Sequence, residues 1–245
     1  MAEPLISIII PTLNEAACLP APLAGLAGNS GLEVIVVDGG STDATTAIVR
    51  AAGVRLIETR AGRAGQLNTG AALATGEILL FLHADTLLPA GFASQIRRIL
   101  SQPGCAAGAF RLTIGATGLK YRLVEQMVNW RSILFAMPYG DQALFLRREL
   151  FRAVGGFPEL PIMEDFVFVR RLRQAGRISI ARATVVTSAR RWRKLGVFRT
   201  TVINQLIIIG YLLGVSPARL ARWYRQGSDG TAEGQDSGVR IQESE

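Results

Sequence analysis

The stretch ILLFLHADT, residues 78–86, places polar side chains directly behind an apolar run. The apolar part predicts a buried strand. His83, the one histidine of the chain, and Asp85 then stand at the end of this strand. A charge is costly there unless something pairs with it. A metal ion, a salt bridge or bulk water at the sheet edge would each satisfy these two residues.

Apolar runs alternate with helical patterns on both sides of this stretch. Strands are expected at 5–10, 32–37, 54–59 and 77–82, each followed by a helix. Ser41 or Thr42 is expected to cap a helix over 43–52, and NEAACLPAPLAGLAG (14–28) predicts another. Such alternation predicts an α/β fold whose mainly parallel sheet has helices on both faces.

The second half of the chain is less regular. Helices are expected at 92–100, 119–135, 164–175, 195–213 and 217–224, and strands at 106–114 and 178–187. The 245 residues suit one α/β domain. We therefore expect a domain over 1–195, a helical C-terminal extension over 196–225 and a disordered tail over 226–245.

Charge is distributed unevenly along the chain. Residues 101–225 hold twenty basic and six acidic residues, whereas residues 1–100 carry a slight negative excess. This asymmetry indicates an anionic partner for the second half, unless it reflects only an arginine-rich surface. Two distant cysteines, Cys18 and Cys105, and an N-terminus without a signal peptide favour a reducing cytoplasm.

Polar residues follow three of the predicted strands, at the rim where ligands of such sheets bind. They are Pro11, Thr12, Asn14 and Glu15 after the first strand, Asp38 after the second, and His83 and Asp85 after the fourth. Neither G-x-G-x-x-G nor the Walker G-x-x-x-x-G-K-[ST] pattern occurs. A divalent cation, Mg²⁺ or Mn²⁺, is therefore the expected bridge between these acids and a phosphate group.

Five blocks of the sequence together resemble family 2 glycosyltransferases. They are SIIIPTLNE, VIVVDGGSTDAT, GRAGQLNTGAALATGEILLFLHADT, RRELFRAVGGF and MEDFVFVRRLRQAG, in the expected order. The HADT and GDQ forms resemble a bacterial subgroup of this family. The resemblance implies a GT-A fold and a metal-dependent, inverting transfer of sugar from a nucleotide-diphosphate donor, such as a UDP- or GDP-sugar, to an unknown acceptor hydroxyl.

The resemblance also implies roles for individual residues. Asp165 matches the catalytic base, and Asp85, with His83 beside it, matches the metal-binding block. Asp38 would hold the base and Glu15 the ribose of the nucleotide. The other implied nucleotide-binding residues are Pro11, Thr12, Asn14, Arg63, Gln66 and Asn68.

Further residues are candidates for the sugar and the diphosphate. Asp141 and Gln142 lie between a strand and a glycine turn, and this position favours a role in hydrogen bonding to the donor or acceptor sugar. Ala84 and Glu164 are further candidates for contacts with these sugars. Arg190, Arg191 and Trp192 could close over the diphosphate. The chain departs from the family at Gly39 and His83, where acids are common, and SARRW (188–192) lacks the glutamine of processive members.

Some alternatives stay open at this point. The basic C-terminal part, with its apolar helix, has the pattern of an interfacial segment for anionic membrane near a lipid-linked acceptor. The same segment could instead pack on the domain or form a homodimer. Acids at the predicted rim argue against nucleic acid as a partner. A nucleotidyltransferase or a non-catalytic nucleotide-sugar-binding relative is the alternative function.

Overall fold

The computed structural model describes residues 3–229, apart from the side chains of residues 191, 194, 195 and 225–229. The chain divides into two compact units, Met1–Ala189 and Arg190–Glu245. The division precedes the boundary at residue 195 that the sequence suggested. The predicted tail over 226–245 overlaps the last helix, which runs to Asp229, and its remainder lies outside the described residues.

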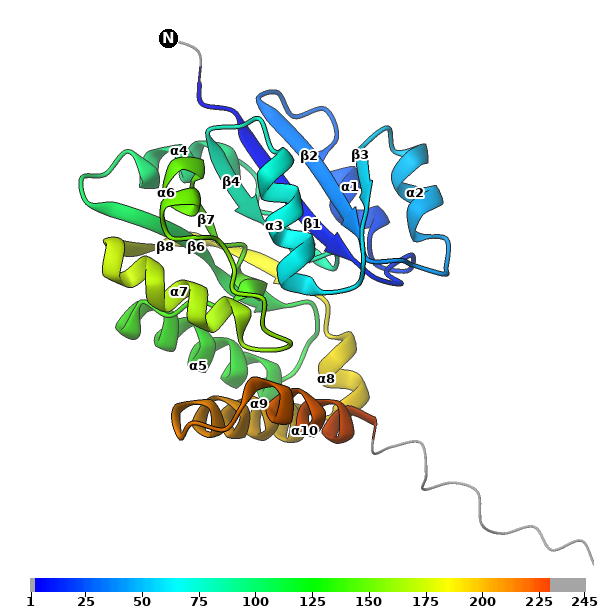
Figure 1. Ribbon diagram of the computed structural model, residues 1–245, viewed down its shortest axis with the longest axis vertical. Coiled ribbons are helices and arrows are strands. Elements are labelled where there is room, and N and C mark those ends of the chain that lie inside the picture. The colour runs from blue at the N-terminus through cyan, green and yellow to red at the C-terminus, as the bar shows by residue number, and fades with distance from the viewer. Residues whose placement is uncertain (1–2, 230–245) are drawn as a thin grey trace, which may run out of the picture. The chain divides into compact units, whose positions relative to one another are not determined.

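The first unit contains the sheet (Figure 1). Its strands are β1 (Ile6–Thr12), β2 (Leu32–Asp38), β3 (Arg55–Glu58), β4 (Ile78–Phe81), β5 (Thr86–Leu87), β6 (Cys105–Ile114), β7 (Phe145–Arg147) and β8 (Arg177–Thr187). Its helices are α1 (Pro20–Leu26), α2 (Thr45–Ala51), α3 (Arg63–Leu73), α4 (Phe92–Leu100), α5 (Leu119–Phe135), η1 (Gly140–Gln142), α6 (Arg148–Ala153) and α7 (Glu164–Ala175).

The eight strands form one sheet in the order β3-β2-β1-β4-β7-β6-β8-β5. Neighbours are parallel from β3 to β4 and between β6 and β8. β7 lies antiparallel between β4 and β6, and β5 pairs antiparallel with β8. The predicted α/β class with a mainly parallel sheet is confirmed, whereas these antiparallel insertions were not predicted.

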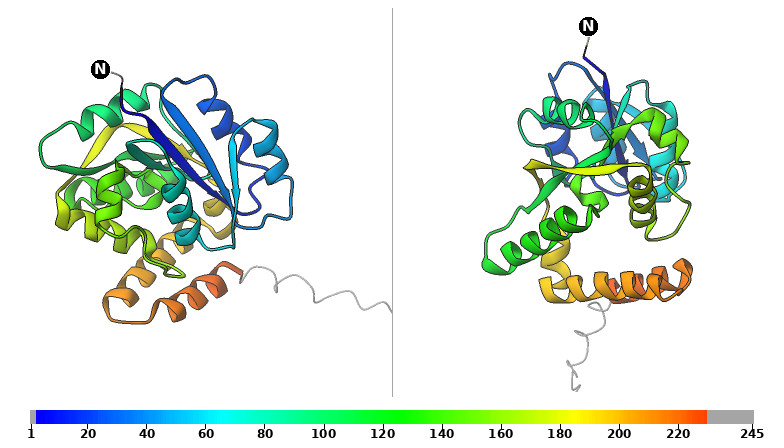
Figure 2. Two further views of the ribbon diagram at one scale, coloured as in Figure 1. Left: turned by 45° about the horizontal axis from the view of Figure 1, so that its top comes forward. Right: turned by 90° about the vertical axis from the view of Figure 1, so that its left-hand side faces the viewer.

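Helices cover both faces of the sheet, as Figure 2 shows. Successive side chains of a strand point to opposite faces. On β1, Ile8 and Ile10 belong to a core cluster that includes residues of α1 and α4. Ile9 points the other way, toward Gly70 of α3, where an added Cβ would lie 2.5 Å from the Ile9 side chain. The glycine therefore lets α3 lie close against the sheet.

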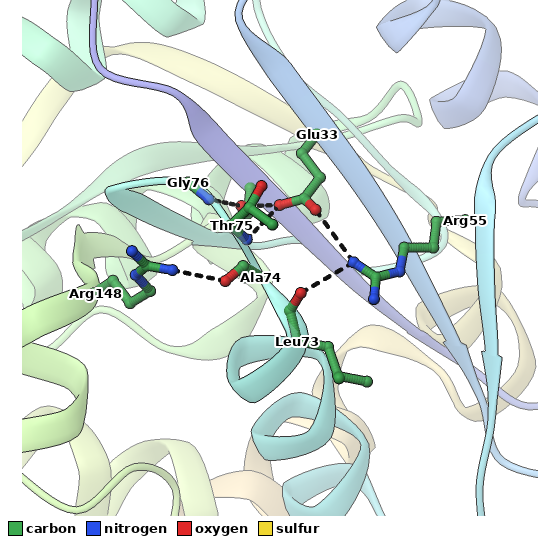
Figure 3. Close-up of polar contacts among 8 residues, drawn as sticks. Glu33, Arg55, Leu73, Ala74, Thr75, Gly76 and Arg148 are labelled. Carbon is green, nitrogen blue, oxygen red and sulfur yellow. Dashed lines mark hydrogen bonds and ion pairs between the residues drawn. The ribbon is translucent and has the colours of Figure 1, made fainter.

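A hydrogen-bond network at the amino ends of the strands holds the end of α3 (Figure 3). Glu33 of β2 accepts bonds from the Thr75 N–H at 2.8 Å and from Arg55 Nη1 at 3.3 Å, and Arg55 Nη1 also donates to Leu73 O at 3.0 Å. Burial raises the pKa of Glu33, but bonds from Ser7 and Thr75 outweigh it and lower the pKa. This network fixes α3, whose opposite end carries Arg63.

Two helix starts differ from the sequence-based prediction. α2 begins at Thr45 after Ala44, without a side-chain cap, because the Ser41 hydroxyl donates to Asp38 instead. α1 is confined to Pro20–Leu26, with proline in its first turn, where a missing N–H costs nothing. The residues before α1 are thereby left in a turn at the rim of the sheet.

The second unit consists of α8 (Arg190–Leu195), α9 (Val197–Leu212) and α10 (Pro217–Asp229). The helical C-terminal extension is thus confirmed, with the predicted helix over 195–213 divided at Gly196. Among residues 3–229, the structure contains no helix with the length and apolar character needed to span a bilayer.

Candidate active site

The ends of β1 and β2 are joined at the rim by Asp38. Thr12 lies opposite Asp38 in the parallel register, and its hydroxyl donates to Asp38 Oδ1 at 3.0 Å. Asp38 Oδ2 accepts the N–H groups of Gly40 at 3.0 Å and Ser41 at 2.7 Å. Burial raises the pKa of Asp38, but these bonds outweigh it and hold the pKa below its usual value. Asp38 therefore stays ionised and fixes its own loop.

The loop after β1 is tied to the loop after β2. Asn14 has a left-handed φ of 55°, and its Oδ1 accepts the Thr42 N–H at 2.9 Å. The Glu15 N–H donates to the Thr45 hydroxyl at 2.9 Å, which leaves the half-buried Glu15 side chain at this rim. Pro11 is buried within β1.

An open pocket of about 720 Å³ lies beside these loops. Its walls come from the end of β2, the following loop, α2 and the end of β3. The lining residues are Asp38, Gly40, Ser41, Thr46, Glu58, Thr59 and Arg60. Among the predicted nucleotide-binding residues, only Asp38 is part of this lining.

Gln66 of α3 bridges the carboxyl ends of β1 and β2. Its side chain is buried, and Nε2 donates to Thr12 O and to Val37 O, each at 2.8 Å. Asn68 has a similar structural task, because its amide exchanges two hydrogen bonds with the backbone of Phe157 at 2.8 and 2.9 Å. Contacts from either amide to a nucleotide would compete with these bonds.

Replacing Gln66 by methionine (Gln66→Met) is expected to lower the free energy of unfolding by about 1–3 kcal/mol. The variant keeps the side-chain size but leaves two buried carbonyl groups without this donor. Urea unfolding at neutral pH measures the change. The matched control is Gln126→Met at an exposed position of α5, where we expect little change. Equal stability of the two variants would contradict the bridging role.

Arg63, the first residue of α3, connects two other segments of the site. Its Nε lies 3.1 Å from Glu164 Oε1 at the start of α7. Its Nη2 lies 2.5 Å from His83 Nε2, behind β4. A guanidinium can only donate, so His83 Nε2 is the acceptor in this contact. Arg63 thus links His83 at the end of β4 to Glu164 at the start of α7.

Gly140 is the point where these groups meet. A Cβ added there would lie 3.1 Å from Arg63 Nη2, 3.2 Å from His83 Nε2 and 3.4 Å from Asp165 Oδ2. Asp165 Oδ2 accepts the Gly140 N–H at 3.0 Å, and Asp165 Oδ1 accepts the Phe166 N–H at 2.7 Å. A Cβ here would be tight against the Arg63 and His83 side chains, and glycine avoids this crowding.

Two further carboxyl groups beside Gly140 have raised pKa values. Burial raises the pKa of Asp141, with Arg131 opposing and Asp165 adding to the effect. Burial and the neighbouring Asp165 raise the pKa of Glu164, with Arg63 opposing. Asp141 Oδ1 is buried and lacks a hydrogen-bond partner among the described residues. This oxygen is an acceptor that a ligand hydroxyl could satisfy.

Gln142 holds the backbone around this cluster. It is fully buried; Nε2 donates to Phe110 O at 2.9 Å, and Oε1 accepts the Ser132 hydroxyl at 2.6 Å. A hydrogen bond from Gln142 to a sugar would require these bonds to break. Ala84, another predicted sugar contact, is also buried.

Asp85 lies at the junction of β5 and β8. Its carboxylate is half-buried, and Oδ1 lies 3.4 Å from the Thr86 hydroxyl and 3.5 Å from the Thr187 hydroxyl. Within residues 3–229, no three histidine, cysteine or acidic side chains are gathered as a ready metal site. A metal would therefore need ligands from outside the protein in addition to Asp85.

The predicted diphosphate residues belong to the second unit. Arg190 and Trp192 lie in α8, and the side chain of Arg191 is outside the described part of the chain. Their role stays a prediction.

Comparison with known families identifies the fold. The model of the family described as Glycosyl transferase family 2 matches residues 7–157, which run from the second residue of β1 through β7 and include Gly140. The chain belongs to glycosyltransferase family 2. Its α/β sheet agrees with the GT-A fold that the sequence predicted.

Curated relatives of this family 2 member come from mycobacteria. The chain is 37% identical over 175 residues to proteins named "PGL/p-HBAD biosynthesis glycosyltransferase" from Mycobacterium bovis and Mycobacterium tuberculosis. The match covers 64% of this chain and 64% of the relatives' length. A second group, named "Uncharacterized glycosyltransferase", is 34% identical over 92 residues, 37% of this chain and 41% of the relative.

Solved structures share the fold. A mannosyltransferase from Pyrobaculum calidifontis, solved with GDP-Man and Mn²⁺, superposes with a TM-score of 0.65 at 23% identity, over 93% of this chain and 70% of that one. S. aureus TarS in complex with UDP-GlcNAc gives a TM-score of 0.60 at 21% identity, over 75% and 58% of the two chains. These likenesses support the fold of the family 2 member.

Three residues of the cluster were missed by sequence reasoning. Gly140 is the first residue of the GDQ form, but sequence reasoning assigned no role to a residue without a side chain. Arg131 of α5 stacks on Tyr139, with its guanidinium carbon 3.4 Å from the ring centroid. Burial raises the pKa of Tyr139 despite this cation. Arg131 and Tyr139 lie outside every family block that the sequence showed, and only the turn before η1 brings them beside Asp141.

Proposed function

We propose that this protein is an inverting glycosyltransferase that uses a nucleotide-diphosphate sugar. The observation that carries the proposal is the convergence of Arg63, His83 and Asp165 on Gly140, beside the unsatisfied buried oxygen of Asp141. Fixed charges can stabilise the charge that develops during the transfer, and an acceptor oxygen without a partner can orient a sugar hydroxyl.

Asp165 is the proposed general base. Two backbone N–H groups, from Gly140 and Phe166, hold its carboxylate in one orientation. In the reaction, Asp165 takes the proton of the acceptor hydroxyl while the acceptor oxygen forms the new bond to the anomeric carbon. The bond to the diphosphate breaks on the opposite face of the sugar, and the nucleoside diphosphate leaves.

Asp141 is the proposed contact for a sugar hydroxyl. Its Oδ1, which has no hydrogen-bond partner in the part of the chain that the structure describes, can accept a bond from such a hydroxyl. Glu164 is bound to Arg63, so its contribution to the sugar site is to hold Arg63 in place. Gln142 and Ala84 are buried, and Gln142 holds the backbone of this site through its hydrogen bonds.

The nucleotide is proposed to occupy the pocket of about 720 Å³ beside β2. Asp38 shapes the wall of this pocket through its loop, because its carboxylate already accepts bonds from Thr12, Gly40 and Ser41. Glu15 is the proposed ribose contact at the edge of the loops. Gln66 and Asn68 act through the backbone that they hold.

The residues present fit a divalent cation through Asp85. A half-buried carboxylate near two hydroxyl groups suits Mg²⁺ or Mn²⁺, which complete their shells with water and diphosphate oxygens. His83 fits less well, because Arg63 contacts its Nε2. When bound, the cation would neutralise charge on the leaving diphosphate. Arg190, Arg191 and Trp192 are proposed to assist there.

Thermal unfolding with nucleotides and nucleotide sugars, with and without Mn²⁺, tests this function. A specific donor stabilises the folded state by about 2.7 kcal/mol at a hundredfold excess over Kd. We expect stabilisation by a UDP- or GDP-sugar that requires the metal, and its loss in Asp85→Asn. Glu149→Gln, an exposed acid on α6, is the control. No stabilisation by any nucleotide sugar would refute the proposal, and metal-independent binding would refute the role of Asp85.

A further inference from the structure

One face of α5 is apolar although it is exposed. Its members are Leu119, Leu123, Met127, Trp130 and Leu134, which we call the α5 stripe; these residues are 76%, 53%, 56%, 65% and 72% exposed. Their spacing of three or four residues places them along one side of the helix. An exposed helix face is ordinarily polar, so a continuous apolar face indicates a surface that another phase or molecule covers.

The second unit presents a face of the same kind. Phe198, Val202, Leu206, Ile209 and Leu213, which we call the α9 stripe, are 83%, 38%, 59%, 51% and 79% exposed. The intervals between these residues are the same as in the α5 stripe. Each unit therefore has its own exposed apolar helix face.

The exposed charges on α5 are positive, and so are all the charges in the stretch 166–228, which contains the α9 stripe. Lys120 and Arg122 are exposed on α5, whereas Glu125 is buried and bound by Arg122 at 2.7 Å. Residues 166–228 contain thirteen arginine and lysine residues and no acidic residue. The covering partner must therefore combine an apolar layer with negative charge, which describes a bilayer that contains anionic lipids.

We propose that the α5 stripe and the α9 stripe lie in the interface of a membrane with anionic lipids. Trp130 and the half-exposed Trp223 of α10 have the amphipathic side chain that favours the headgroup level. A second copy of the chain fits less well, because a symmetric pairing of these faces would bring their basic flanks together. This docking does not depend on the proposed reaction.

Co-sedimentation of the full chain with vesicles tests the proposal. We expect binding to phosphatidylcholine vesicles that contain phosphatidylglycerol, and about tenfold or greater weakening by Leu123→Glu and by Leu134→Glu. Leu73→Glu is the matched control, because Leu73 is a 43% exposed leucine on α3. Binding of the α5 variants that equals the binding of this control would overturn the role of the α5 stripe.

Fluorescence of Trp130 gives a second test that leaves the stripe intact. In the variant Trp192→Phe/Trp223→Phe, Trp130 is the remaining tryptophan. We expect vesicles to shift its emission to the blue and lipids brominated near the headgroup to quench it. Unchanged emission with saturating anionic vesicles would refute the proposal. A lipid-free dimer that Leu134→Glu dissociates would assign the stripe to a second copy instead.

Discussion

The variant Asp165→Asn is expected to lower kcat by about two to four orders of magnitude, the usual contribution of a general base. Asparagine keeps the shape of the side chain and can still accept the N–H of Gly140, which Asp165 Oδ2 binds at 3.0 Å. It cannot take a proton from the acceptor hydroxyl. The loss should therefore appear in turnover and not in the affinity for the donor.

Steady-state kinetics and donor titration together measure this split. Donor binding, followed by thermal unfolding, should remain within a few-fold of the wild type. Glu149→Gln provides the control for a change from carboxylate to amide at an exposed position. If Asp165→Asn retains full turnover, Asp165 is not the base, and the raised pKa of Asp141 makes that residue the next to replace.

The variant Arg63→Met is expected to lower the free energy of unfolding by about 2–3 kcal/mol and to abolish activity. Arg63 contacts both Glu164 and His83, so its loss leaves a buried carboxylate without its cation. The expected cost is below that of a fully buried pair, about 3–5 kcal/mol, because the Arg63 side chain is 35% exposed. Urea unfolding and a transfer assay measure the two losses separately.

A second substitution separates stability from function. Adding Glu164→Gln to Arg63→Met removes the uncompensated charge, and we expect most of the stability to return while activity stays lost. Additive destabilisation by the two changes would show that Arg63 and Glu164 are not coupled.

The stability deficit of Arg63→Met should also depend on pH. Burial and Asp165 already raise the pKa of Glu164 above its model-compound value of 4.5, and without Arg63 this pKa rises further. The folded variant then binds a proton more tightly than the unfolded chain does. The deficit is therefore complete above the folded-state pKa of Glu164 in the variant. It disappears as the pH falls through the folded-state pKa of Glu164 in the wild type, which already lies above 4.5. A deficit independent of pH would point to lost packing instead.

Local sequence patterns were sufficient for most helices and strands. α4 and α5 begin and end where the apolar periodicity predicted, because one face of each helix packs on the sheet. β5 was missed because it has two residues and owes its existence to pairing with β8. The antiparallel place of β7 likewise depends on its partners β4 and β6, which lie far away in the sequence.

The family blocks pointed to the rim of the sheet, but they did not distinguish residues that could contact a ligand from residues that hold the backbone. Gln66 and Asn68 stand close to Arg63 in one family block, yet their amides hold backbone groups of other segments. Whether either amide can bind a ligand depends on which groups of distant segments its side chain contacts. The spacing of residues along the chain does not predict these contacts.

The sequence by itself determined that this chain folds as an α/β domain with acids behind its strands, because strand and helix periodicity and the family blocks are properties of neighbouring residues. Only the tertiary structure decided that Arg63 contacts His83 at the end of β4, and that Asp165 lies beside them at Gly140. Such pairings join segments that are distant in the chain, and they arise only when packing of the sheet and its helices brings the segments within hydrogen-bond distance.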